Sequence, residues 1–346
     1  MQKKIISPSK LLNPDGTLVQ QGWARDLILE YNREDIHRFK NNFLNKLRIK
    51  EWDYYAILSP KAVLALTISD IGYLGMMSVS WIDLEKKGQT TENEIIPFPL
   101  GKTNLPPSSK EGSVSFVGKK LRVSFEKISG ERILKVDFPA FLNGIGIKAE
   151  ISLYQQKDMD SIVMITPFKE DRRCFYYNQK INCMPAKGWV KVGDRHEGLT
   201  GDNCFGVLDW GRGVWPWQNT WYWGSASGVI DKHSFGFNIG YGFGDTSAAS
   251  ENALFYDGKI HKLDQVTFHF DETDFLKPWR FSSNDGRFEL DFLPILDRSA
   301  KINMGVLATE QHQVFGLFTG NVILDSGEKI YLDKFLGFAE KVYNRW

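Results

Sequence analysis

Residues 113–138, SVSFVGKKLRVSFEKISGERILKVDF, contain three short segments in which apolar and polar side chains alternate. Side chains in a β-strand point alternately to the two faces of a sheet, so this period of two predicts strands with one solvated face. Turns that contain Gly118 and Gly130 separate the segments, and short glycine-containing turns favour antiparallel hairpins. The stretch therefore predicts a three-stranded meander, with strands at Ser113–Val117, Leu121–Phe125 and Ile133–Phe138.

The same pattern recurs on both sides of this meander. Further strands are expected at Tyr54–Leu58, Ala62–Ile68, Tyr73–Asp83, Ile147–Tyr154, Ser161–Thr166, Cys174–Asn178, Phe235–Gly242, Ala253–Tyr256, Lys259–Leu263, Val266–Phe270, Trp279–Ser282, Arg287–Phe292, Val322–Leu324 and Glu328–Leu332. One short helix is expected within Arg33–Leu47, where apolar residues recur at steps of three and four. Many short antiparallel strands without alternating helices predict an all-β protein built as sandwiches or closed up-and-down barrels.

Length and composition favour two β bodies. The chain has 346 residues, 42% of them hydrophobic and 25% charged, which is typical of globular proteins. Its 24 Phe, 12 Tyr and 11 Trp favour sheet over helix. We predict a boundary inside the tryptophan-rich stretch described below, with residues 1–212 forming a lead-in plus the first body and residues 213–346 forming the second.

Several classes of partner are not expected. The net charge of +1 gives no field that would attract nucleic acid or an anionic membrane. No apolar run approaches the roughly 20 residues that a membrane-spanning helix needs. The basic start leads into Pro8 without an apolar segment, and the three cysteines form no CxxC pair, so we expect a reduced, cytoplasmic protein. The sequence does not fix the oligomeric state or a role for Cys174, Cys183 and Cys204.

The most unusual stretch is Gly206–Gly228, GVLDWGRGVWPWQNTWYWGSASG. Tryptophan is enriched where an apolar wall also carries a polar group, so this density indicates a ligand pocket, a packed junction between domains, or both. If the stretch from Trp217 forms a strand, its odd-numbered residues share one face of the sheet. The candidate ligand-binding residues are Trp210, Trp215, Trp217, Gln218, Asn219, Trp221, Tyr222 and Trp223.

Two charged residues in this stretch are candidate catalytic residues. Asp209 stands between Leu208 and Trp210, and burial would raise the pKa of its carboxyl toward that of a usable general acid. Arg212 would orient that acid. The alternative is a purely structural Asp209–Arg212 ion pair, which base rates favour.

Other kinds of site receive little support. The six histidines and three cysteines have no zinc-binding spacing, so we expect no metal and no cofactor. The segment Gly224–Gly228 has Ala226 at the centre where a nucleophilic serine would stand. Glu251 and Asn252 form a polar pair that fits an exposed loop or a group supporting the ligand site; we include both as candidate ligand-binding residues.

Four segments carry a family resemblance. The segments beginning at Leu208 (LDWGRGVWPWQNTWYWGSASG), Asn13 (NPDGTLVQQGWARDLILEYNR) and Glu251 (ENALFYDGKIHKL), together with the ending LDKFLGFAEKVYNRW, resemble a bacterial family known as domain of unknown function 2804. The match runs nearly end to end. The family itself implies no activity.

A more distant resemblance concerns two short motifs. Asp209-Trp210-Gly211 and Gly337-Phe338-Ala339-Glu340 are similar to motifs of tandem-lipocalin proteins of the hydroxyneurosporene synthase and tocopherol cyclase type. This resemblance implies two lipocalin-like (calycin) antiparallel barrels side by side, with few short helices. It also implies that Asp209 protonates a double bond of an apolar substrate. Those relatives have a histidine between the acid and Trp-Gly, whereas here Asp209 directly precedes Trp210.

These observations support three hypotheses about function. The first is a hydrophobic small-molecule ligand, isoprenoid or acyl, bound in a tryptophan-lined cavity near the domain junction, with cyclisation, hydration or isomerisation promoted by Asp209. The second is a non-catalytic lipid-binding or stress-related tandem lipocalin. The third is a carbohydrate-binding or carbohydrate-active protein, because tryptophan beside Asn and Gln also suits sugar rings. Whether the protein is an enzyme stays open at this point.

Overall fold

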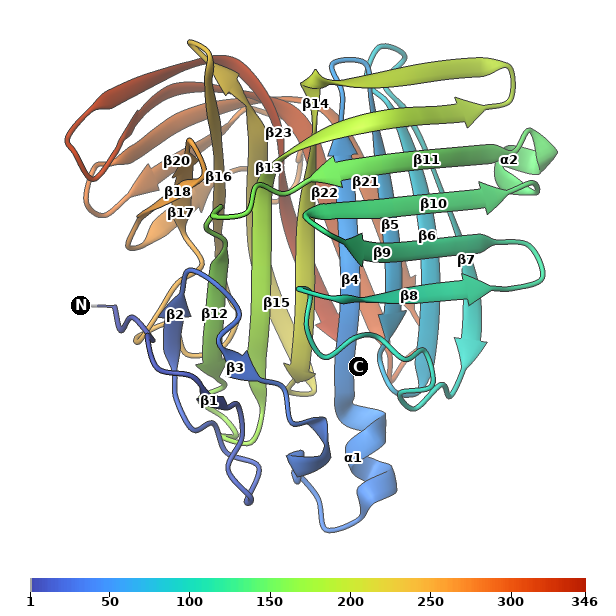
Figure 1. The fold of residues 1–346 in the computed structure, drawn as a ribbon, viewed down its shortest axis with the longest axis vertical. Coiled ribbons are helices and arrows are strands. Elements are labelled where there is room, and N and C mark those ends of the chain that lie inside the picture. The colour runs from blue at the N-terminus through green and yellow to red at the C-terminus, as the bar shows by residue number, and fades with distance from the viewer. Residues whose placement is uncertain (1) are drawn as a thin grey trace.

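The computed structural model describes residues 2–346, and most of these form two large antiparallel sheets (Figure 1). The larger sheet contains β2 (Gly22–Ala24), β4 (Ile49–Leu58), β5 (Ala62–Asp70), β6 (Leu74–Asp83), β7 (Gly88–Pro97), β8 (Gly112–Val117), β9 (Arg122–Ile128), β10 (Glu131–Phe138), β11 (Ile147–Tyr154), β12 (Ile162–Pro167), β13 (Phe175–Val192) and β14 (Arg195–Val214). Its main order is β7-β6-β5-β4-β14-β13-β11-β10-β9-β8, with β12 and then β2 added on β13.

The smaller sheet has nine strands. They are β15 (Gln218–Ile230), β16 (His233–Tyr241), β17 (Ala253–Tyr256), β18 (Lys259–Lys262), β19 (Val266–His269), β20 (Trp279–Ser283), β21 (Phe288–Asn303), β22 (Ala308–Ile323) and β23 (Lys329–Arg345). Their order is β18-β17-β16-β15-β23-β22-β21-β20-β19. Both sheets are curled, so the prediction of an all-β protein made of two antiparallel bodies is confirmed.

The few remaining elements lie near the N-terminus or in one loop. They are β1 (Ser9–Lys10) and β3 (Leu29–Glu30), which pair in parallel, the 3₁₀ helix η1 (Arg33–Asp35), α1 (Asn42–Arg48) and α2 (Phe141–Gly144). The single helix expected within Arg33–Leu47 is wrong in extent. Asn41 caps α1, because its side chain accepts hydrogen bonds from the amides of Phe43 and Leu44, and this fixes the start of the helix after the 3₁₀ turn.

The smaller sheet packs across the face of the larger sheet around β4, β13 and β14 (Figure 1). The chain leaves the larger sheet after Val214 and enters the smaller one at Gln218, so the tryptophan-rich stretch spans the end of β14, the connection and most of β15. One hydrophobic core fills the larger sheet and the contact between the sheets, and a second core lines the other face of the smaller sheet. Among residues 2–346, no helix is long and apolar enough to cross a membrane.

Candidate functional site

A cavity of about 160 Å³ lies where the two sheets face each other. Its walls combine aromatic rings with charged and polar side chains. These come from β4, β5, β6, β13 and β14 on one side and from β15, β21, β22 and β23 on the other, with Phe243 from the loop after β16. The lining residues are Trp52, Tyr54, Thr67, Met76, Ser78, Tyr176, Lys180, Asp209, Trp221, Trp223, Phe243, Arg298, Gln311 and Glu340.

Strand register places one polar row on the wall formed by the larger sheet. Lys180 on β13 is opposite Asp209 on β14, which is opposite Tyr54 on β4. The row continues through Thr67 on β5 to Ser78 on β6. Directly paired residues project to the same face of a sheet, so these five side chains all point to the cavity.

A second row forms the wall of the smaller sheet. Trp223 on β15 is opposite Glu340 on β23, Glu340 is opposite Gln313 on β22, and Gln313 is opposite Arg298 on β21. Trp221 stands two residues before Trp223 and shares its face. The amide nitrogen of Gln313 lies 3.1 Å from the Tyr54 hydroxyl, which connects the two rows across the contact between the sheets.

The charges on the first wall centre on one buried cation. Lys180 Nζ lies 2.8 Å from Asp209 Oδ2 and 4.0 Å from Glu251 Oε2. The ammonium also lies 3.9 Å from the centre of the Trp223 ring. Within residues 2–346, Asp209 Oδ1 is buried and has no hydrogen-bond partner. The ion pair thus leaves one carboxylate oxygen of Asp209 free to interact with a ligand.

Glu340 is the acidic group of the second wall. Its Oε1 accepts a hydrogen bond of 3.1 Å from Trp221 Nε1, and its Oε2 accepts one of 3.1 Å from Gln313 Nε2. Burial raises the pKa of this carboxyl to about 7, against the lowering effects of the Trp221 hydrogen bond and of Lys180. At neutral pH a large share of Glu340 is therefore a neutral acid that can donate a proton.

This raised pKa predicts a pH dependence of stability. The folded pKa of Glu340 is about 7 against an ordinary value of 4.5. The contribution of Glu340 to the free energy of unfolding is therefore greatest below pH 4.5. It falls as the pH rises through 7, by about 3 kcal/mol altogether. The variant Glu340→Gln lacks this titration. Urea unfolding should show the variant gaining stability relative to wild type by about that amount across this range; parallel pH profiles of the two proteins would contradict the assignment.

Aromatic rings close the rest of the cavity. Tyr176 stacks between Trp52, at 5.7 Å between ring centres, and Phe243, at 5.3 Å. Its hydroxyl is buried without a hydrogen-bond partner among the described residues, and burial keeps the pKa of the phenol well above its usual range. Tyr176 therefore offers a neutral O–H group beside the charged pair. Trp215 packs behind this layer, 5.0 Å from Tyr176 and 5.2 Å from Trp221.

The structure brings some of the residues predicted from the sequence to the cavity. Asp209, Trp221 and Trp223 line it. Glu251 is fully buried near Lys180, and its Oε2 accepts a hydrogen bond of 2.7 Å from Asn178. The neighbouring Asn252 is buried as well and accepts a hydrogen bond from the amide of Gly240 at 2.7 Å. The exposed-loop interpretation of this pair is therefore wrong.

Other predicted residues lie away from the cavity. Tyr222 points to the opposite face of β15 and stacks on Tyr241 at 4.5 Å. Trp217 precedes β15 and is 49% exposed, so it is not part of the wall. Gln218 is exposed, and the Asn219 amide donates to the carbonyl of Gly242.

Arg212 and Trp210 also face away, which corrects the predicted ion pair. Residues three apart in a strand point to opposite faces, so Arg212 cannot share a face with Asp209 on β14. Arg212 Nη2 instead donates to Asp53 Oδ1 at 2.9 Å, and its guanidinium lies 4.3 Å from the Trp210 ring centre. Both the Asp209–Arg212 ion pair and the orienting role of Arg212 are therefore wrong, and Lys180 is the partner of Asp209.

Sequence reasoning missed Lys180, Glu340 and Tyr176. Glu340 did carry a signal, since it ends the Gly337–Glu340 motif that resembles the tandem lipocalins. Lys180 and Tyr176 carried none, because only the pairing of β13 with β14 brings them beside Asp209.

The remaining observations concern clusters of metal-ligating side chains and the three cysteines. The part of the chain that the structure describes contains no group of three or more His, Cys, Asp or Glu side chains that could hold a metal ion. The three cysteines are free and buried. Burial raises the pKa of both the Cys174 and Cys183 thiols to about 12, so these thiols are protonated and poor nucleophiles at neutral pH.

Comparison with known proteins identifies the family. The model of the family described as "Domain of unknown function (DUF2804)" matches residues 2–346, so the chain belongs to that family. No curated protein sequence matches the chain. A crystal structure of CghA with Sch210972 is similar over 86% of this chain and 88% of that chain, with 11% identity and a TM-score of 0.53. A crystal structure of kievitone hydratase from Nectria haematococca is similar over the same shares, with 10% identity and a TM-score of 0.48.

These likenesses concern the fold. The likeness to CghA agrees with the predicted fold of two lipocalin-like barrels. The predicted family is confirmed by the family model. The likenesses assign no activity, because at this level of identity the same fold serves many functions.

Proposed function

We propose that this member of the DUF2804 family binds an apolar small molecule of isoprenoid or acyl type in the cavity between its sheets, and catalyses an acid-promoted reaction of a double bond. One observation carries the proposal. Glu340, whose pKa burial raises to about 7, faces a buried Lys180–Asp209 pair across a cavity walled by aromatic rings. Titratable groups held in different environments at one site are typical of acid–base catalysis.

The lining of the cavity favours an apolar ligand. Trp52, Tyr176, Trp221, Trp223 and Phe243 supply flat apolar surface. At about 160 Å³ the cavity is smaller than the ~300–1,000 Å³ common for whole ligands, so it accommodates the reacting segment of a longer molecule. The crystal structure of CghA with Sch210972 is consistent with a small-molecule ligand in a protein of this fold.

The proposed reaction begins with proton transfer from Glu340. Its O–H bond breaks, a new C–H bond forms at one carbon of the double bond, and the π electrons leave a cation at the other carbon. The faces of Trp221 and Trp223 and the free carboxylate oxygen of Asp209 would stabilise this positive charge. In an isomerisation, a carbon next to the cation loses a proton to Asp209 and a new double bond forms. In a cyclisation, a second double bond of the substrate first forms a C–C bond to the cationic carbon, and the new cation then loses a proton to Asp209. In a hydration, water adds to the cationic carbon and its extra proton passes to Asp209; proton exchange with solvent then restores Glu340 and Asp209.

This assignment changes the part played by Asp209. Lys180 already donates to one of its oxygens at 2.8 Å, so Asp209 is suited to receive a proton or face a cation. Among residues 2–346, no cationic side chain forms an ion pair with Glu340, which takes the role of general acid. Lys180 is then a positioning residue that holds Asp209 in place.

A non-catalytic lipid carrier is the second candidate. It is favoured by the buried Lys180–Asp209 pair, because such pairs also occur as structural elements without catalysis. A carbohydrate platform has less support, since Trp217 is the only tryptophan of Gly206–Gly228 that is exposed.

Mass spectrometry of lipids that co-purify with the protein tests the proposal. We expect an unsaturated isoprenoid or acyl molecule bound at no more than one per chain in wild type. A conversion product that forms on incubation with wild type and not with Glu340→Gln would establish catalysis. Binding without conversion favours the carrier. Absence of any lipid, together with a change of tryptophan fluorescence on titration with oligosaccharides, would contradict both.

A further inference from the structure

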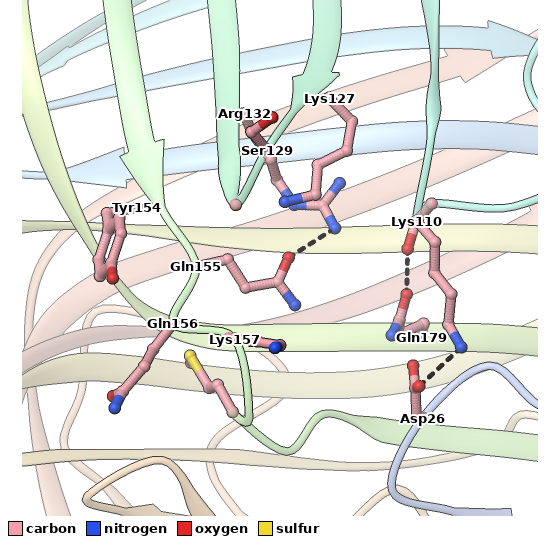
Figure 2. Close-up of a pocket in the computed structure, with 13 residues that line it drawn as sticks. Asp26, Lys110, Lys127, Ser129, Arg132, Tyr154, Gln155, Gln156, Lys157 and Gln179 are labelled. Atoms are coloured by element: carbon pink, nitrogen blue, oxygen red, sulfur yellow. Dashed lines mark hydrogen bonds and ion pairs between the residues drawn. The ribbon is translucent and has the colours of Figure 1, made fainter.

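A second pocket, of about 460 Å³, lies on the opposite face of the larger sheet, near the turn between β9 and β10 (Figure 2). Gln179 lines this pocket and its neighbour on β13, Lys180, lines the first cavity, so the sheet itself separates the two sites. Cationic and amide side chains are among the residues that line the second pocket, namely Lys127, Arg132, Gln155 and Gln179. Its volume is within the ~300–1,000 Å³ that small-molecule sites commonly have.

Two of these cations are direct cross-strand neighbours. Arg132 on β10 is paired in register with Lys127 on β9, and both side chains point into the pocket (Figure 2). Like charges directly opposite each other destabilise an antiparallel pair. Burial, with Arg132 adding to the effect, lowers the pKa of Lys127 to about 8. The pairing is therefore unfavourable unless an anion lies between the two groups.

Arg132 is also buried without a carboxylate partner. It is 3% exposed, and its two terminal nitrogens reach only neutral oxygens, those of Gln155 at 3.0 Å and Tyr55 at 3.4 Å. Its Nε is buried and has no hydrogen-bond partner, and the guanidinium forms no ion pair with any of residues 2–346. The nearby Asp53 is already paired with Arg212 at 2.9 Å. Burying a charge without a counterion is costly in free energy. The buried guanidinium of Arg132 therefore lacks the anionic partner that would offset this cost.

The rim adds more positive charge. Lys110 and Lys157 line the pocket beside Lys127 and Arg132, and Asp26 is the one acidic residue among the lining residues. Asp26 is engaged with Lys110 at 2.6 Å (Figure 2). The pocket lining thus contains four cationic side chains and one carboxylate. The resulting excess of positive charge includes the buried, unpaired guanidinium of Arg132.

We propose that this pocket binds the oxyanion of a small organic molecule, a phosphate or a carboxylate, between Arg132 and Lys127. The amide groups of Gln155 and Gln179 border the same space, and Met159 and Tyr154 provide apolar contact for the rest of the molecule. The proposal is independent of the acid chemistry at Glu340, because the two pockets open on different faces of the sheet.

Isothermal titration of the full chain with three probes tests this site. The probes are inorganic phosphate, phenyl phosphate and benzoate, which distinguish a free phosphate, a phosphate ester and a carboxylate. We expect saturable binding of at least one probe at one per chain, and binding about 10- to 100-fold weaker in Lys127→Gln and in Arg132→Gln, as loss of a charged hydrogen bond implies.

Lys148→Gln is the matched control, since Lys148 is exposed on β11 and its removal changes the net charge equally. This control should bind like wild type. Lys127 is only partly buried, so Lys127→Gln keeps the test valid if Arg132→Gln fails to fold. Failure of all three probes to bind wild type would overturn the proposal, as would equal weakening by Lys148→Gln and Lys127→Gln.

Discussion

Replacement of Lys180 by methionine is expected to destabilise the folded protein by about 3–5 kcal/mol, which is the usual cost of removing one partner from a buried ion pair. The Lys180 side chain is 1% exposed and serves two carboxylates, those of Asp209 and Glu251. Burial already raises the pKa of Glu251, and Lys180 opposes that effect. Without the ammonium, both carboxyls must take up protons or remain buried as unpaired charges. Urea unfolding at neutral pH measures the loss.

Two further variants make this prediction specific. Lys191→Met removes an exposed lysine from the same strand, β13, and should change stability by less than about 0.5 kcal/mol. Adding Asp209→Asn and Glu251→Gln to Lys180→Met removes the orphaned charges and should recover part of the loss. A Lys180→Met protein as stable as wild type would show that the pair contributes nothing to folding.

Replacement of Glu340 by glutamine is expected to lower turnover of the co-purified lipid by about 10²–10⁴-fold, the contribution typical of a general acid. Glutamine keeps the size of the side chain and an oxygen that accepts from Trp221, so the cavity keeps its shape. Turnover by wild type should fall as the pH rises through about 7, because Glu340 must be protonated to act. Product formation measured by mass spectrometry at several pH values checks both expectations.

The control for this variant is Glu328→Gln, which changes an exposed glutamate in the turn before β23. It should react like wild type. If Glu340→Gln retains wild-type turnover while Asp209→Asn abolishes it, then Asp209 is the general acid, as the sequence predicted, and the roles proposed above are reversed.

Some hairpins were predictable from sequence because one face of each of their strands is more exposed than the other. The meander at residues 113–138 shows this, since β8, β9 and β10 lie where alternation predicted strands. The long strands were not. The first ten residues of β13 and the last eleven of β14 are buried throughout, because the smaller sheet covers their second face. Alternation disappears there, so β13 was predicted only as Cys174–Asn178.

The candidate site was predictable only in part for the same reason. The density of tryptophan located the contact between the sheets, and one motif pointed to Asp209. Glu340 ends the other motif but was not predicted as a site residue. The partner of Asp209 was not predictable, because Lys180 becomes its neighbour through strand register. Proximity in sequence suggested Arg212, whereas alternation along β14 sends that side chain to the opposite face. Predicting the pair required knowledge of which strands are adjacent.

Tryptophan fluorescence titration with farnesol, geranylgeraniol and oleic acid tests the proposed cavity most directly, in wild type and in Ser78→Leu. Ser78 lines the cavity, is 5% exposed, and sits directly opposite Thr67, so a leucine there would fill the space between the walls. We predict saturable binding of at least one of these molecules to wild type, and none to a Ser78→Leu protein that unfolds at the wild-type Tm. Equal binding by the two proteins, or no binding of any of the three molecules to wild type, would contradict a ligand site between the sheets.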